Sequence, residues 1–170
     1  VHVFDFWNDE FLGTWDSGIS LSINPTSCRV LTLLPDNGEI QLISTSRHIT
    51  QGWVDLLKLQ SQSKGTMISG TSRVPGGEPY VLSFAYPRGS NFKINNARAF
   101  IGKKSIPVKM MCHQGWATME FSVNELTEVN WSVSFEPAVS YNYAVRQPEG
   151  IEVSSAGIDA VKITWQSQYY

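Results

Sequence analysis

Apolar and polar residues alternate along almost the whole chain, and this two-residue period restricts the fold more than any other feature. In residues 128–136 every second residue is apolar, namely Val129, Trp131, Val133 and Phe135. Successive side chains of a β strand point to opposite faces of the sheet, so this period indicates strands with one buried face. No stretch of ten or more residues has the period of an amphipathic helix. We therefore predict an all-β protein.

Turn residues divide the alternating pattern into short strands. Pro, Gly, Asn and Asp, which favour turns over strand interiors, separate the predicted strands. These strands are residues 1–7, 18–24, 27–34, 39–45, 53–61, 65–73, 79–86, 92–101, 105–112, 115–123, 128–136, 151–156 and 160–166. Strands spaced by about ten residues between 53 and 136 predict an antiparallel β-sandwich of immunoglobulin-like type.

A polar stretch at residues 44–52 lies between two strand-rich regions and predicts two parts of the chain. Residues 1–46 would supply N-terminal strands, either the end of a preceding β-sandwich or an addition to the second part. Residues 47–170 would form the immunoglobulin-like sandwich with the C-terminal strands. The sheet of the N-terminal strands is expected either to look incomplete or to take in residues 151–165 at its edge, because an unpaired edge attracts another strand.

Charge and composition limit the partners. With 42% apolar residues, the 170-residue chain is long enough for a globular core. Its net charge of −2 lacks the basic stripe that nucleic acid requires, so no nucleic-acid partner is expected. The apolar runs are only a few residues long, so no membrane span is predicted. Cys28 and Cys112 are expected to be buried free thiols rather than a disulfide.

The chain begins on an apolar strand, at Val1, without an initiator Met. We expect it to be part of a longer protein, with a part of the function in what precedes Val1. The first residues also contain Asp5, which alternation places on the same face as Val3. A carboxylate there is expected to be satisfied by a strand-end amide or by an arginine such as Arg29 rather than to be catalytic.

Three segments resemble parts of known carbohydrate-active enzymes. Residues 2–13, with 19–21 and 27–31, are similar to the end of the C-terminal β-sandwich of bacterial α-galactosidase-like glycoside hydrolases. Residues 79–136 resemble the immunoglobulin-like accessory modules of bacterial polysaccharide-degrading enzymes, and 148–165 resemble the first two strands of a fibronectin type III module.

The resemblance implies a noncatalytic accessory module that supports or spaces a catalytic domain of the same parent chain. It implies a secreted, periplasmic or cell-surface location and a polysaccharide as a possible ligand. The catalytic carboxylates of such enzymes would lie in the barrel that precedes Val1, so none is assigned to this chain.

The remaining polar residues give no catalytic or metal site. Most carboxylates fall in predicted turns or on exposed strand faces, whereas a glycosidase needs two of them across a cleft. His2, His48 and His113 lie too far apart in sequence to form a metal-binding motif. We therefore predict no metal, no cofactor and no enzymatic activity in this chain.

Aromatic residues provide the candidate ligand-binding site, because exposed flat rings stack on sugars. Trp131 and Trp165 alternate with aliphatic residues and are predicted to be core. Trp116 instead shares a polar face with Glu120, and Trp53 follows the polar stretch. Trp116, Trp53 and Glu120 are thus the predicted ligand-binding residues, although packing between units also explains exposed tryptophans. The functions considered are an accessory module, a carbohydrate-binding module and an adhesion domain with a large apolar patch.

Overall fold

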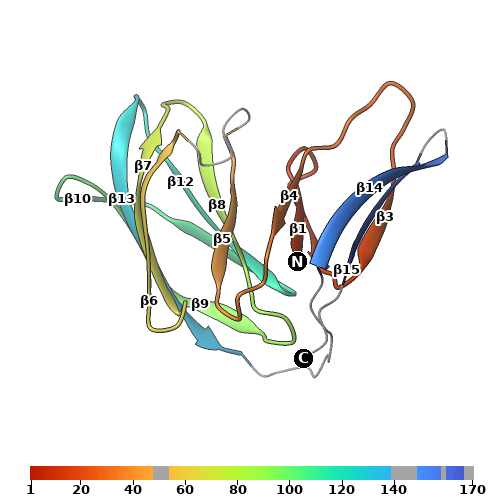
Figure 1. The fold of residues 1–170 in the computed structure, drawn as a ribbon. Helices are drawn as coiled ribbons and strands as arrows, with labels where there is room; N and C mark the ends of the chain where they lie inside the picture. The colour runs from red at the N-terminus through yellow and green to blue at the C-terminus, as the bar shows by residue number, and fades with distance from the viewer. Residues whose placement is uncertain (48–53, 139–148, 158–159, 167–170) are drawn as a thin grey trace. The chain divides into compact units, whose positions relative to one another are not determined.

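The computed structural model describes residues 1–47, 54–138, 149–157 and 160–166 (Figure 1). Every regular element in these ranges is a strand, and every pairing between them is antiparallel. The strands are β1 (His2–Asp5), β2 (Glu10–Thr14), β3 (Gly18–Ser22), β4 (Leu31–Leu34), β5 (Gln41–Thr45), β6 (Leu56–Gln62), β7 (Met67–Val74), β8 (Pro79–Ala85), β9 (Phe92–Ile101), β10 (Lys104–Ile106), β11 (Lys109–His113), β12 (Trp116–Ser122), β13 (Thr127–Pro137), β14 (Glu149–Gly157) and β15 (Ala160–Gln166). The predicted all-β, antiparallel class is confirmed.

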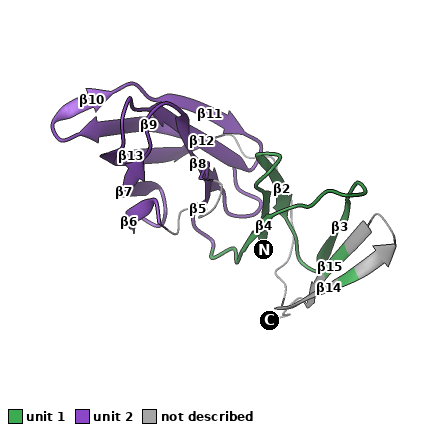
Figure 2. Ribbon diagram, turned by 90° about the horizontal axis from the view of Figure 1, so that it is seen from above, with its two compact units in different colours: residues 1–37, 143–170 green, residues 38–142 purple. Residues whose placement is uncertain are grey.

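The chain forms two compact units, coloured separately in Figure 2. Unit 1 comprises residues 1–37 and 143–170, and unit 2 comprises residues 38–142. The boundary predicted between residues 46 and 47 is therefore displaced. The physical reason is strand pairing: β5 bonds to β8 and so belongs to unit 2, while β15 bonds to β3 and so brings the C-terminal strands into unit 1.

Unit 1 contains two three-stranded sheets, with strand orders β2-β1-β4 and β14-β15-β3. Its core includes Val3, Ile19 and Ile163, all buried. Ile163 pairs with Ile19, so the C-terminal strands join β3 and not the sheet that contains β1, whose edge they were expected to close. Strand β2 was not predicted, because its sequence EFLGT has two adjacent apolar residues followed by a glycine and so lacks the two-residue period.

Asp5 is fully buried in unit 1 and has the partners that its position required. Arg29 Nη1 lies 2.6 Å from Asp5 Oδ2, and Asn8 donates its side-chain Nδ2 at 2.8 Å and its backbone N–H at 3.2 Å. This confirms the prediction that an arginine and an amide satisfy the carboxylate. The cluster holds the turn after β1 against the segment that precedes β4.

Unit 2 is a β-sandwich of a five-stranded sheet, β10-β9-β13-β7-β6, and a four-stranded sheet, β11-β12-β8-β5. The single strand predicted at 105–112 is in fact two strands in different sheets: β10 bonds to β9, and β11 bonds to β12. Pro107 lies between them and has no N–H to donate, so the ladder breaks where the chain changes sheet. The assignment of this sandwich to the immunoglobulin type stays a prediction.

Alternation places the core of unit 2 as expected. Trp131 is only 2% exposed, as predicted, and its ring lies edge-on to Phe84 from the opposite sheet. The buried residues of this core come from both sheets and are Ile40, Ile68, Val74, Tyr80, Leu82, Phe84, Tyr86, Ala99, Ala117, Met119, Phe121, Val123, Val129, Trp131, Val133 and Phe135. The side chain of Trp165, also predicted as core, lies outside the described residues.

A buried chain of hydrogen bonds crosses this core. Trp131 Nε1 donates to Ser72 Oγ at 2.9 Å, and Ser72 Oγ lies 3.2 Å from the Tyr80 hydroxyl. The Tyr80 hydroxyl donates to Asp55 Oδ2 at 2.6 Å, and Thr45 donates to the same oxygen at 2.8 Å. Because these residues come from both sheets, the chain of bonds fixes the sheets in register and satisfies the buried carboxylate.

The Tyr80 hydroxyl predicts how stability responds to alkaline pH. Burial, followed by the hydrogen bond to Asp55, raises the pKa of Tyr80 well above its usual value. The pKa of Tyr80 in the folded state lies above its unfolded value of about 10. The stabilisation that the protonated hydroxyl provides is therefore complete below pH 10 and is lost as the pH rises above it. We expect the free energy of unfolding, measured with urea, to fall less steeply with pH above pH 10 for Tyr80→Phe than for wild type. The difference in slope is expected to be about 1.4 kcal/mol per pH unit. Identical slopes would contradict this assignment.

Both cysteines are free, as predicted, but both are exposed rather than buried. Cys112 lies on β11, the edge strand of its sheet, where only β12 is bonded to it. Cys28 lies in the segment between β3 and β4, outside any strand. Edge and loop positions thus explain why period two alone misplaced these side chains.

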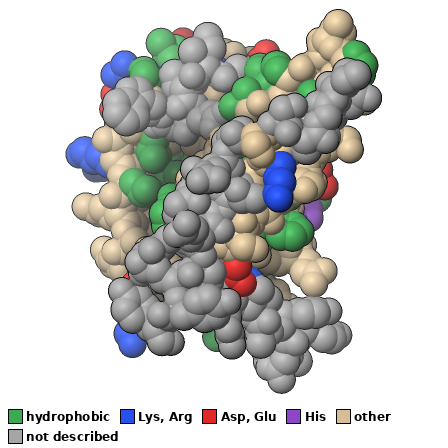
Figure 3. Space-filling view, turned by 45° about the vertical axis from the view of Figure 1, so that its right-hand side comes forward, with side chains coloured by type: hydrophobic (Ala, Val, Ile, Leu, Met, Phe, Trp, Pro, Cys, Tyr) green, Lys and Arg blue, Asp and Glu red, His purple; other side chains and the backbone are tan. Residues whose placement is uncertain are grey.

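Among the described residues no helix has the length and apolar character needed to cross a membrane. On the face seen in Figure 3, acidic and basic side chains lie singly or in small groups among uncharged ones.

Candidate functional site

The predicted residue Trp116 lies at the start of β12, on the face opposite to the core. Its neighbours Ala117 and Met119 are fully buried, which confirms the predicted alternation. His113, its cross-strand partner on β11, stacks on the indole with ring centroids 4.3 Å apart and an angle of 17° between the planes. The imidazole therefore covers one face of the indole ring.

Glu120 lies on the same face of β12 and pairs with Lys109 of β11, whose Nζ is 3.0 Å from Glu120 Oε1. Four residues along a strand correspond to about 13 Å, so Trp116 and Glu120 do not converge on one small ligand. Trp53 lies outside the described residues. Ligand binding by Trp116, Trp53 and Glu120 stays a prediction.

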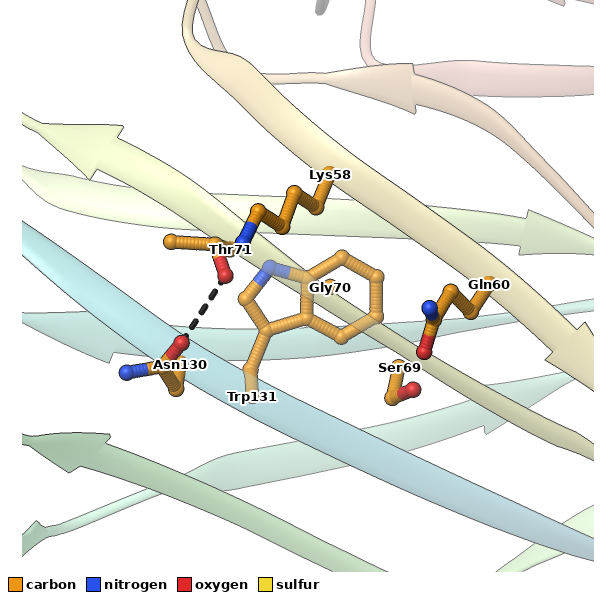
Figure 4. A pocket seen from close by; sticks show the side chains of 7 residues that line it. All are labelled: Lys58, Gln60, Ser69, Gly70, Thr71, Asn130 and Trp131. Carbon is orange, nitrogen blue, oxygen red and sulfur yellow. Dashed lines mark hydrogen bonds between the residues drawn. The ribbon is translucent and has the colours of Figure 1, made fainter.

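A groove of about 340 Å³ lies elsewhere in unit 2, on the sheet formed by β6, β7 and β13 (Figure 4). We call it the polar groove. Its lining consists of Lys58, Gln60, Ser69, Gly70, Thr71, Asn130 and Trp131. Lys58 is the only residue in this lining that carries a formal charge, and the others offer amide and hydroxyl groups, a bare backbone and one indole.

Strand register explains why these polar side chains gather. Lys58 is paired with Thr71, which is paired with Asn130, and Asn130 in turn with Phe100 on β9. These four residues form one row across the sheet, which we call row 1. Residues that are directly paired point to the same face, and the buried neighbours of Asn130, Val129 and Trp131, fix the other face as the core. Row 1 therefore faces outward.

A second row lies next to the first. It contains Gln60, Ser69, Ser132 and Arg98, paired in that order from β6 to β9. We call this set row 2. Two residues along a strand separate rows 1 and 2, which is about 7 Å. The lining of the polar groove includes Lys58, Thr71 and Asn130 of row 1 and Gln60 and Ser69 of row 2. Its polar character is the direct result of alternation on three adjacent strands.

Gly70 lies between the two rows and gives the groove its depth. Its cross-strand partner is Trp131, and a Cβ at Gly70 would lie 2.5 Å from Trp131 Cζ2 and 2.5 Å from the carbonyl oxygen of Lys58. No side chain fits there, so the indole packs directly against the glycine backbone. The buried Trp131 thereby supports the floor of the polar groove.

Hydrogen bonding sets which groups of the groove remain available. Thr71 Oγ1 donates to Asn130 Oδ1 at 2.8 Å, as the dashed line in Figure 4 shows. The Asn130 amide nitrogen is thereby left as a donor, and the Thr71 oxygen as an acceptor. In Figure 4 the Lys58 side chain extends toward Thr71, while Gln60 and Ser69 lie at the other end of the groove. The groove therefore offers both donors and acceptors.

Sequence reasoning did not find the polar groove. Residues 58, 60, 69, 71 and 130 have the pattern of an ordinary solvent-exposed strand face, and nothing in their order shows that β13 lies beside β7. One signal was present, because a glycine inside a strand often marks a close approach of another group. Gly70 between Ser69 and Thr71 is such a position.

Within the described ranges, no three His, Cys, Asp or Glu side chains gather closely enough to hold a metal ion. Comparison with protein families, with characterised proteins and with solved structures finds no match to this chain.

Proposed function

We propose that this chain is an accessory β-sandwich module of a carbohydrate-active enzyme and that it binds carbohydrate in the polar groove. The observation that carries the proposal is the convergence of amide, hydroxyl and ammonium groups in one groove on a sheet face. The hydroxyl groups of a sugar both donate and accept hydrogen bonds, and the lining of the groove contains acceptors and donors for them. The noncatalytic role rests on the sequence resemblance alone.

The shape of the groove also fits this ligand class. Its volume of about 340 Å³ is at the lower end of the range of ligand sites. It lies across strands rather than between sheets, so an extended chain of sugars passes over it without entering the core. Water-mediated contacts are expected at its rim, since polar recognition on an open surface is commonly wet.

An aromatic ring lies at the end of row 1. Phe100 is paired with Asn130, so the ring is one strand spacing, about 5 Å, from the groove lining. It is partly exposed. Phe100 replaces Trp116 as the aromatic residue best positioned to stack on a sugar that occupies the polar groove.

The adhesion hypothesis required a large apolar patch on a sheet face. Rows 1 and 2 are instead polar except for Phe100, so this face favours carbohydrate over an apolar protein partner. The remaining exposed apolar side chains of unit 2 include Leu57 and Leu59 on β6, which is an edge strand. Leu57 and Leu59 belong to the sheet edge, whereas Met67 on β7 is exposed two residues from Ser69 on the outward face, where it is a single apolar side chain beside row 2.

The test is titration of the wild-type chain against a panel of soluble polysaccharides, monitored by calorimetry. For a polysaccharide that binds, Asn130→Ala is expected to lower the affinity about fivefold to thirtyfold, because each hydrogen bond to the ligand contributes about 1–2 kcal/mol. Gln60→Ala is expected to act in the same direction.

Trp116→Ala serves as the matched control, because it removes an aromatic ring from the other sheet of the same unit. Its affinity is expected to equal that of wild type within twofold. Loss of binding in Trp116→Ala with full binding in Asn130→Ala would place the site on β12 and would contradict the proposal.

A further inference from the structure

The sheet that bears the polar groove differs in charge from the chain as a whole. Its strands β6, β7, β9, β10 and β13 contain five Lys or Arg residues and two Glu residues, whereas the net charge of the chain is −2. The opposite sheet carries only Lys109 and Glu120, which pair with each other. Positive charge is thus concentrated on one sheet of unit 2.

Both acidic residues of this sheet are neutralised by neighbours. Glu128 Oε1 lies 3.6 Å from Arg73 Nη2, and Glu136 Oε1 lies 2.9 Å from Lys93 Nζ. Glu128 and Glu136 lie near the two ends of β13, outside rows 1 and 2. The centre of the face therefore carries no carboxylate in these two rows.

Rows 1 and 2 each contain one cation, at opposite ends. Lys58 begins row 1 on β6, and Arg98 ends row 2 on β9. Among the described residues neither Lys58 nor Arg98 has an acidic partner within ion-pair distance. Lys58 and Arg98 lie three strands apart and two residues apart along the strand direction. Their positions are therefore separated by about 16 Å, with only uncharged side chains between them.

We propose that the polar groove selects acidic carbohydrate, whose carboxylate or sulfate groups bind Lys58 and Arg98 while its hydroxyl groups bind Asn130 and Gln60. This inference rests on the proposed carbohydrate-binding function and adds the substrate class. A neutral sugar accepts at most a hydrogen bond from the Lys58 ammonium and forms no ion pair with either cation. An acidic oligosaccharide that lies diagonally across rows 1 and 2 places one anionic group at each end, where both cations are exposed and unneutralised.

The test compares three hexasaccharides of equal length: a galacturonate oligomer, a sulfated galactan oligomer and a neutral galactan oligomer. Binding to the full chain is measured by calorimetry at low salt, about 0.05 M, and at high salt, about 0.5 M. At low salt we expect the better of the two acidic oligomers to bind at least about tenfold more tightly than the neutral one, with most of this difference lost at high salt. Which acidic oligomer binds better identifies the anionic group.

Three variants remove one positive charge each from the same sheet. Lys58→Gln and Arg98→Gln are expected to weaken binding of the acidic oligomer about fivefold each. Arg98 lies outside the lining of the polar groove, so Arg98→Gln is expected to leave binding of the neutral oligomer within about twofold. Arg73→Gln is the matched control, because its guanidinium is already paired with Glu128. Its effect on the acidic oligomer is expected to be less than about threefold. Circular dichroism of each variant is the check that these substitutions of exposed residues leave the protein folded.

The results separate the two proposals. Equal affinity for neutral and acidic oligomers, unchanged in Lys58→Gln and Arg98→Gln, overturns the charge selectivity and leaves carbohydrate binding intact. Absence of binding to all three oligomers and to the panel of soluble polysaccharides overturns the proposed function itself. A single-stranded DNA oligomer that competes equally with the acidic sugar also overturns the inference, because the face would then bind any polyanion.

Discussion

Gly70→Ala is expected to destabilise unit 2 by about 2–4 kcal/mol, with a fall in melting temperature of about 10 °C or more. The alanine Cβ would lie 2.5 Å from both Trp131 Cζ2 and the Lys58 carbonyl oxygen. Neither group yields easily. The indole is buried and hydrogen-bonded through Nε1 to Ser72, and the carbonyl belongs to the backbone of β6. Thermal unfolding measured by circular dichroism provides the value.

A double-mutant cycle with Trp131→Phe identifies the cause of this loss. Phenylalanine lacks the outer ring atoms of the indole, so Gly70→Ala is expected to cost at least about 1 kcal/mol less in the Trp131→Phe background. An equal cost in both backgrounds would contradict the indole contact as the cause. Gly102→Ala is the comparison: nothing lies within 4 Å of its added methyl group, so its cost comes from the left-handed backbone at φ 58°, which Gly70 lacks, and not from a contact.

Asp5→Ala is expected to destabilise unit 1 by about 3 kcal/mol or more. It removes the acceptor of three contacts, from Arg29 at 2.6 Å and from Asn8 at 2.8 and 3.2 Å. The carboxylate is fully buried, and Arg29 is 28% exposed. Loss of one partner from a buried ion pair leaves a charge and two donors without compensation, which costs far more than the pair itself contributes. Hydrogen exchange of the β1 and β4 amides measures the effect on unit 1 directly.

The Lys109–Glu120 pair offers a matched comparison for Asp5. Its atoms are 3.0 Å apart, but Lys109 is 73% exposed and Glu120 30% exposed. Glu120→Ala is therefore expected to change the free energy of unfolding by less than about 1 kcal/mol. Equal effects of Asp5→Ala and Glu120→Ala would show that burial does not control the strength of these pairs.

The sequence was sufficient to predict the fold class and many local features. Alternation identified most strands, the buried Trp131 and the outward position of Trp116, because the two-residue period reports directly on which face is buried. It also led to the Asp5–Arg29 contact, since a buried carboxylate requires a partner. The division at Pro107 was missed, although a proline within an alternating pattern is a sufficient reason to expect a break.

The candidate site depended on information that no local pattern contains. The polar groove needs β6 beside β7 and β7 beside β13, and the last pairing joins residues about sixty positions apart, as with Thr71 and Asn130. Period two shows that Lys58, Ser69 and Asn130 face away from the core, but it does not show that they face the same solvent-filled groove. The strand order, which the sequence alone does not determine, brings these side chains into one groove.

The pairing of β15 with β3 makes unit 1 discontinuous, whereas unit 2 is a continuous segment. During folding, Ile19 can pair with Ile163 only when the C-terminal strands reach β3. This pairing closes a loop that contains the whole of unit 2. The entropy cost of such a loop rises with its effective length. If unit 2 folds first, one compact body replaces most of the flexible residues of that loop, and the entropy cost of pairing β15 with β3 is expected to fall.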